Sequence, residues 1–162
     1  MWGYNMKNLA CSIIAVTALI FSSAVYAQSF NFDVVWKPVE RVGGMTGSDG
    51  NLYGGGAVSG TYTTTYADGT KTNGTARCVG MSQPQGSIFA IHLACTTTEG
   101  KDTATEVYGC NYLGKPGPET ALGCVGGIEA KTGPNMGRRG ALTMEWYSET
   151  GARGTGQWYS TK

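Results

Sequence analysis

The sequence predicts an all-β protein: an eight-stranded antiparallel meander β-barrel with two disulfides, preceded by a cleaved signal peptide. Three observations predict this fold. After Ala27, no segment keeps a 3.6-residue apolar period for more than two helical turns. Runs rich in β-branched and aromatic residues alternate instead with clusters of Gly, Pro, Asn and Asp. Four cysteines lie within these runs, and an even number in such a domain suits disulfides.

The runs predict eight strands in one domain over residues 28–162. They cover residues 30–37, 56–66, 71–82, 88–98, 103–113, 120–129, 139–148 and 154–160. The links between most of them are short, such as Ala67-Asp68-Gly69-Thr70, and short links join antiparallel neighbours. Eight strands close a sheet around packed side chains or one small ligand, and closure removes the exposed edges. The longer glycine-rich stretch 38–55 is expected to be a loop.

Side-chain alternation supports some strands more than others. In the second run, Tyr62 and Tyr66 share a face with Val58, opposite a row of threonines. In the seventh run, Leu142 and Trp146 lie opposite polar residues. The fourth run is apolar on both faces, as expected for a strand covered by a second subunit. A homo-oligomer is therefore a further prediction.

Residues 1–27 have the pattern of a secretory signal peptide. Lys7 precedes the apolar core Ile13–Phe21, which is shorter than the roughly 20 residues that span a bilayer. Val25-Tyr26-Ala27 fits the small-residue cleavage rule. We expect export to the periplasm or the extracellular space, with a retained membrane anchor as the alternative.

Removal of residues 1–27 from the 162 leaves 135, the size of one domain. Lys7 is the single charged residue in the removed part, so 11 basic and 11 acidic residues remain. A mature protein without net charge is not expected to bind nucleic acid or an anionic membrane. Glycine is in large excess over its usual share of about 7%, and we assign it to turns, bulges and close strand packing.

The turn positions favour the disulfides Cys78–Cys95 and Cys110–Cys124. The cluster 84–87 lies near the midpoint of the first pair, and the cluster 115–118 lies near the midpoint of the second. A Cys95–Cys110 pairing stays open, because the turn at 100–102 is also central to it. No metal site is expected, since no C-x-x-C spacing occurs and His92 is the only histidine.

The glycine pattern of the C-terminal third resembles that of allene oxide cyclase-like and dirigent-like proteins. The residues concerned are Gly126-Gly127, Gly133 and Gly137-Arg138-Arg139-Gly140, followed by a β-rich segment up to Trp146. The resemblance implies an eight-stranded antiparallel barrel, often oligomeric, and carries over no catalytic residue. Pro134-Asn135 lies between the glycines, where the family pattern is more compact. Val58–Tyr62 is similar to avidin-like strands, but the tryptophans do not recur in the order of a biotin pocket.

Few residues are candidates for chemistry in the barrel interior. His92 is a candidate general base, because histidine is the residue type commonly used for proton transfer near neutral pH, if its face, opposite that of Cys95, points inward. Glu106 is the candidate acid, because enclosure raises the pKa of a carboxyl group. Glu129 and Glu145 also lie in expected strands, and for all three glutamates an outward position is the alternative.

Aromatic residues are the candidates for ligand binding. We expect a small apolar or aromatic ligand to contact Tyr62, Tyr66, Trp146 and Trp158. Trp36, Tyr108 and Tyr112 belong to the same aromatic set, part of which is expected to form the core. No cofactor-binding motif is present.

Two functions follow from these candidates. The first is an exported barrel without catalysis that binds a small apolar or aromatic molecule or a protein partner. The alternative is a cofactor-free isomerase or cyclase of the allene oxide cyclase or dirigent type, which acts by shaping a reactive ligand in the cavity.

Overall fold

The computed structural model describes residues 27–48, 52–117 and 119–159. The predicted signal peptide lies outside the described residues, apart from Ala27. Eight strands account for most of the described chain. Their bounds are β1 Gln28–Thr46, β2 Leu52–Tyr66, β3 Lys71–Ser82, β4 Ile91–Glu99, β5 Asp102–Tyr112, β6 Leu122–Ala130, β7 Arg139–Ser148 and β8 Gly151–Trp158. The described residues form no helix, so none of them supplies a helical membrane span.

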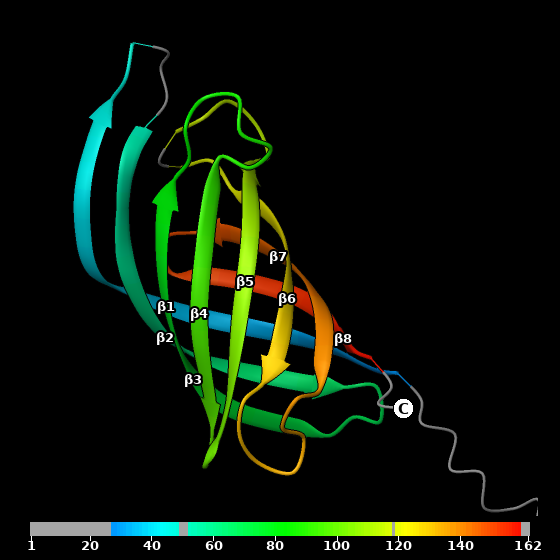
Figure 1. Cartoon of the computed structure of the whole chain (residues 1–162). Helices are drawn as coiled ribbons and strands as arrows, with labels where there is room; N and C mark the ends of the chain where they lie inside the picture. The colour runs from blue at the N-terminus through cyan, green and yellow to red at the C-terminus, as the bar shows by residue number, and fades with distance from the viewer. Residues whose placement is uncertain (1–26, 49–51, 118, 160–162) are drawn as a thin grey trace, which may run out of the picture.

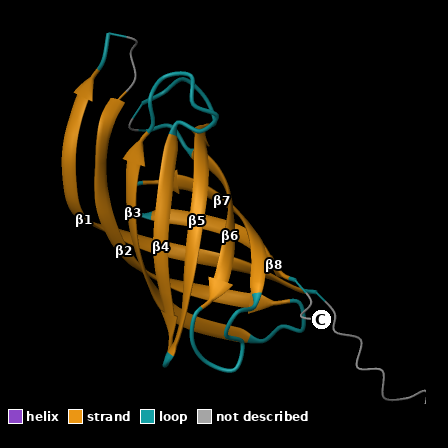
Figure 2. Ribbon diagram, in the orientation of Figure 1, coloured by secondary structure: helices purple, strands orange, loops and turns teal. Residues whose placement is uncertain are grey.

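The eight strands form the predicted closed antiparallel meander barrel (Figure 1). Each strand pairs with the next one along the chain, and β1 pairs with β8 to close the sheet. The closure can be seen at Phe30 of β1, which pairs with Tyr66 of β2 on one side and with Gly156 of β8 on the other. The links β2–β3, β4–β5 and β7–β8 are short turns, whereas the links that follow β3, β5 and β6 are longer loops (Figure 2). In the β2–β3 turn, Asp68 accepts a hydrogen bond from the Thr70 amide at 2.9 Å, and Gly69 takes the positive φ that the turn requires.

The expected loop over 38–55 is wrong, because β1 and β2 continue through most of it. The two strands stay paired as far as Thr46 and Leu52, and form an arm that projects past the other strands at the upper left of Figure 1. Two register shifts, one after Pro38 and one after Gly43, bend the arm. The ladder holds here because backbone pairing needs no side chains, so a glycine-rich sequence does not exclude a strand.

Both predicted disulfides are confirmed. Cys78 lies opposite Cys95 in the β3–β4 ladder, and Cys110 lies opposite Cys124 in the β5–β6 ladder, each pair with Cα atoms 4.0 Å apart. All four cysteines are buried in the barrel core. The alternative Cys95–Cys110 pairing fails, because the β4–β5 register places Glu106 opposite Cys95.

Much of the glycine excess faces inward-pointing aromatic rings. A Cβ atom added at Gly60 would lie 2.7 Å from the Trp36 ring, and one at Gly126 would lie 2.7 Å from the Tyr108 ring. In both cases the two residues are direct partners on adjacent strands. The same arrangement recurs for Gly74 with Tyr62, Gly154 with Phe32 and Gly156 with Phe30. These glycines make room for rings that lie flat across the neighbouring strand, inside a small barrel.

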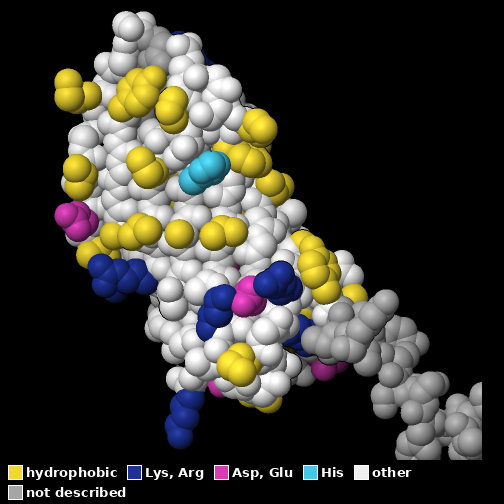
Figure 3. All heavy atoms as spheres, viewed as in Figure 1, with side chains coloured by type: hydrophobic (Ala, Val, Ile, Leu, Met, Phe, Trp, Pro, Cys, Tyr) yellow, Lys and Arg dark blue, Asp and Glu magenta, His cyan; other side chains and the backbone are white. Residues whose placement is uncertain are grey.

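The outer surface carries exposed apolar side chains. On β3 to β6 these are Val79, Met81, Val107 and Val125, each more than half exposed. Figure 3 shows apolar side chains gathered around the single histidine on this face. The homo-oligomer stays a prediction.

Candidate functional site

The barrel interior contains a cavity of about 160 Å³. The turns between β4 and β5 and between β6 and β7 surround its mouth, and Trp36 and Met144 lie at its inner end. An apolar cavity of roughly 150 Å³ in another protein binds benzene, so this volume suits a single ring with a short substituent. It is smaller than the roughly 300 Å³ that a drug-sized ligand needs.

Three of the four predicted ligand-binding aromatics line this cavity: Tyr62, Tyr66 and Trp158. The Phe30 ring packs near two of them: its centre lies 5.8 Å from that of the Tyr66 ring and 6.1 Å from that of the Trp158 ring. Tyr62 and Tyr66 face inward because β2 alternates, as the sequence predicted. The wall is therefore an aromatic surface built by β1, β2 and β8.

Trp146, the fourth predicted ligand residue, does not line the cavity. Its ring stacks on Trp36 with ring centres 5.0 Å apart; Trp36 belongs to the core, and the half-buried Trp146 packs against it. Trp146 instead lines a groove of about 580 Å³ at the opposite end of the barrel, beneath the β1–β2 arm, together with Tyr112. Trp146 and the three aromatic residues of the cavity therefore line different surfaces of the barrel.

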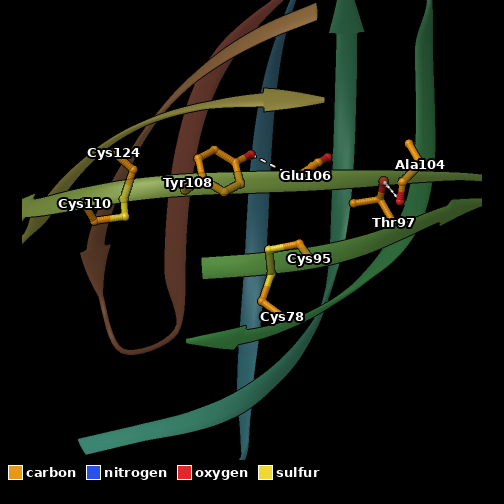
Figure 4. Close-up of a disulfide and its surroundings, with 8 residues drawn as sticks. All are labelled: Cys78, Cys95, Thr97, Ala104, Glu106, Tyr108, Cys110 and Cys124. Carbon is orange, nitrogen blue, oxygen red and sulfur yellow. Dashed lines mark hydrogen bonds between the residues drawn. A yellow bond between two sulfur atoms is a disulfide. The ribbon is translucent and has the colours of Figure 1, made fainter. Parts of the chain in front are cut away.

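Glu106 is the one candidate acid that lies inside the barrel. Its position follows from the register, because it pairs with the buried Cys95 and shares a face of β5 with Tyr108 and Cys110. Figure 4 shows the Tyr108 hydroxyl directed toward Glu106, and it donates a hydrogen bond to Oε2 at 2.8 Å. The side chain keeps part of its surface open to the cavity.

Burial raises the pKa of Glu106 above its ordinary value, while hydrogen bonds from Tyr108 and Thr97 oppose the shift. The pKa of Tyr108 is raised well above its usual range by burial and by the charge of Glu106. No basic side chain in the described part of the chain lies within ion-pair distance of Glu106. Its carboxyl group is thus enclosed with neutral hydroxyl partners only.

Two further carboxyl groups, Glu99 and Asp102, lie at the mouth of the cavity. Burial raises the pKa of Tyr62, and the charges of Glu99 and Glu106 raise it further, so the Tyr62 hydroxyl lies in the field of both. Arg138 also lines the mouth. Its guanidinium group is held by the Gln28 side chain and the Tyr159 carbonyl, each at 3.3 Å, and lies 5.6 Å from the centre of the Trp158 ring.

Trp36 contributes an unusual polar atom to the interior. Its side chain is 3% exposed, it lines the cavity, and its Nε1 has no hydrogen-bond acceptor among the described residues. A buried N–H group without an acceptor costs free energy, about 1–3 kcal/mol.

His92 lies on the outer face of β4 and is exposed, so it does not line the cavity where a general base was expected. The reason is the alternation of the strand. Cys95 points inward to form its disulfide with Cys78, and His92 has the opposite parity. Outside the barrel, the His92 ring packs near Phe89, with centres 5.8 Å apart.

Glu129 and Glu145 also point outward. Glu129 accepts hydrogen bonds from Lys131 at 2.6 Å and Arg139 at 3.0 Å, which lower its pKa. Glu145 pairs with Arg153 on the neighbouring strand, at 2.8 Å. Both are surface ion pairs of the outer sheet face.

Sequence reasoning missed Phe30 and Phe32 in the β1 wall and the Thr97 hydroxyl, which hydrogen-bonds to Glu106. Phe30, Phe32 and Trp36 alternate with polar residues and all line the cavity, so the period-two pattern of 30–36 was a usable signal. Thr97 carried no such signal, because a buried threonine looks like any strand threonine.

No group of three or more metal-ligating side chains occurs among the described residues. The chain was compared with family models, curated proteins and solved structures, and none matches. The resemblance to allene oxide cyclase-like and dirigent-like proteins therefore stays a prediction.

Proposed function

We propose that this protein is a binding barrel, which takes up a small, mainly apolar or aromatic molecule through the end surrounded by the β4–β5 and β6–β7 turns. The observation that carries the proposal is the cavity itself. Its volume of about 160 Å³ accommodates one ring, and its wall combines aromatic surface with a single enclosed carboxyl group. Apolar walls with a few placed polar groups are typical of small-molecule sites.

Glu106 also supports a second candidate, the cofactor-free isomerase or cyclase. An enclosed carboxyl group with a raised pKa holds its proton to a higher pH than an exposed one and can deliver it to a bound ligand. The Tyr108 hydroxyl would orient this acid through its hydrogen bond to Oε2. His92 has no part in this mechanism, because it lies on the outer face.

We further propose that the protein works in an oxidising compartment after export. Two disulfides favour the periplasm or the extracellular space over the reducing cytosol.

The binding proposal is tested by filling the cavity from one wall. Ala104 lines the cavity, whereas Ala94 is exposed on the outer face of β4, so Ala104→Leu and Ala94→Leu make the same chemical change on opposite sides of the sheet. We expect Ala104→Leu to reduce by at least about tenfold the affinity for a single-ring ligand, and Ala94→Leu to leave it unchanged. Isothermal titration calorimetry with toluene and benzyl alcohol measures this, and mass spectrometry of the native protein identifies any molecule that copurifies. Equal affinity in both variants would contradict binding in the cavity.

A further inference from the structure

We propose that the ligand is a small organic amine, whose protonated nitrogen pairs with Glu106 while its apolar part lies against the aromatic wall. This inference rests on the proposed binding function and names the chemical class of the ligand. It uses three features of the cavity: the enclosed carboxyl group, the rings around it and the charges at the mouth.

The first feature is a carboxylate site without a cation. Glu106 accepts a hydrogen bond from Tyr108 at 2.8 Å, and no basic side chain of the described chain lies within ion-pair distance of it. A buried charge costs free energy unless it is paired, and a protein that keeps a carboxyl group in its interior usually supplies a partner. Here the open surface of Glu106 faces the cavity, so a bound ligand is the group able to supply the positive charge.

The second feature is the aromatic wall around this carboxyl group. Tyr62, Tyr66, Tyr108 and Trp158 all line the same cavity as Glu106. The faces of tyrosine and tryptophan rings attract ammonium groups, and this attraction strengthens where water is excluded. A ring wall with one carboxylate is a recognised way to bind an organic cation. An inorganic cation fits less well, because Ca²⁺ and Mg²⁺ need six or more oxygen ligands, and the described residues bring together no group of three ligating side chains.

The third feature is the charge at the mouth. Glu99 and Asp102 lie there, on the side from which a ligand enters, and their charges attract a cation and repel a carboxylate ligand. Among the described residues that line the cavity, Arg138 is the single basic side chain. It is held by Gln28, the Tyr159 carbonyl and the Trp158 ring, so its charge is fixed at the rim rather than next to Glu106.

The experiment compares three ligands of nearly equal shape: benzylamine, benzyl alcohol and toluene. Isothermal titration calorimetry measures each with the wild-type protein, with Glu106→Gln and with Glu145→Gln. Glutamine keeps the acceptor for the Tyr108 hydroxyl but carries no charge, and Glu145 is a matched carboxyl group on the outer face. In the wild-type protein and in Glu145→Gln, we expect benzylamine to bind more tightly than benzyl alcohol, by about tenfold or more. In Glu106→Gln we expect this preference to disappear.

A pH series from 5 to 8.5 on the wild-type protein tests the inference without any variant. Benzylamine stays protonated over this range, as a lysine side chain does, whereas Glu106, whose pKa is raised by burial, loses its proton as pH rises. The other titratable or charged groups that face Glu106 in the cavity are Tyr62 and Tyr66 of β2, Glu99 of β4, Asp102 and Tyr108 of β5 and Arg138 before β7. The tyrosines stay neutral here, because burial raises their pKa values. We expect the affinity for benzylamine to rise with pH and that for toluene to stay constant.

The outcomes separate the inference from the function on which it rests. The proposed amine ligand is contradicted if benzyl alcohol and toluene bind but benzylamine binds more weakly. It is also contradicted if Glu106→Gln keeps the preference for benzylamine. In both cases the proposed binding function stands. If no ligand of the series binds, the proposed function fails and the inference fails with it.

Discussion

At the scale of the residue, Glu106 determines what the interior can do. A carboxyl group enclosed among aromatic rings and hydroxyl groups favours its neutral form, because the charged form loses its hydration. The same feature that equips the cavity for a cation or a proton transfer therefore carries a cost in stability at neutral pH. Natural proteins commonly keep such costs at functional sites.

This cost predicts how stability depends on pH. The folded protein holds the Glu106 proton more tightly than the unfolded chain does, whose carboxyl pKa is about 4.3. The contribution of Glu106 to stability is therefore fully present below that value and is lost as pH rises through the raised folded pKa. We expect Glu106→Gln to melt near the wild-type temperature at pH 4 and above it at pH 8, measured by circular dichroism.

Glu129→Gln is the contrasting control. Hydrogen bonding and charge from Lys131 and Arg139 lower the pKa of Glu129, so its contribution is present above the unfolded pKa and is lost as pH falls. The difference in melting temperature between Glu129→Gln and the wild type should be small, because the side chain is on the surface. At pH 8 this difference should have the opposite sign to that of Glu106→Gln. A Glu106→Gln difference that does not change with pH would contradict a buried carboxyl group.

At the scale of the element, the strands depend on pairs of a glycine and an aromatic ring. Tyr108 lies across Gly126 of the neighbouring strand, and this contact positions the hydroxyl that bonds to Glu106. The glycine and the aromatic residue are far apart in sequence, so each looks unremarkable alone. Their pairing explains the part of the glycine excess that was assigned to close strand packing.

Gly126→Ala tests this pairing. Its Cβ would lie 2.7 Å from the Tyr108 ring and closer still to the Val107 carbonyl oxygen, so the ring or the backbone must move. We expect a loss of about 1–3 kcal/mol of unfolding free energy in urea titrations. Gly127→Ala is the matched control, because its Cβ meets only the Gly140 carbonyl oxygen, at an ordinary 3.6 Å. Equal losses in the two variants would show that the tyrosine contact is not the cause.

At the scale of the whole molecule, closure and the two disulfides hold the barrel together. β1 must meet β8 across the entire length of the chain, and this pairing of distant segments costs much chain entropy. The disulfides tie the hairpins β3–β4 and β5–β6, which lie on the side of the barrel away from the β1–β8 seam. They therefore stabilise the middle of the sheet and leave the seam to backbone pairing and packing.

The double variants Cys78→Ala/Cys95→Ala and Cys110→Ala/Cys124→Ala measure these contributions. The sequence separations are 17 and 14, so the two losses should be similar, about 3 kcal/mol each in the chain-entropy model. Urea unfolding of each variant, and of the wild type with and without reductant, gives the values. Free thiols detected in the denatured, unreduced protein without residues 1–27, and therefore without Cys11, would contradict the pairing.

The sequence by itself predicted the strand order and most strand positions, and it favoured the disulfide pairing that the structure has. The physical reason is that each hairpin is local: a turn fixes which residues lie opposite each other, as at Cys78 and Cys95. It also placed Tyr62, Tyr66 and Trp158 among the candidates that line the cavity. Turn chemistry and period-two alternation were sufficient for these conclusions.

Only the tertiary structure decided which face of each strand is inside. Alternation divides His92 from Cys95 but does not say which one points inward, and that choice depends on how all eight strands close together. Closure placed Glu106 in the cavity and His92 on the surface, separated Trp146 from the other ligand candidates, and extended β1 and β2 through a glycine-rich segment. The cavity volume has the same origin, because it is what remains after side chains from every strand have packed.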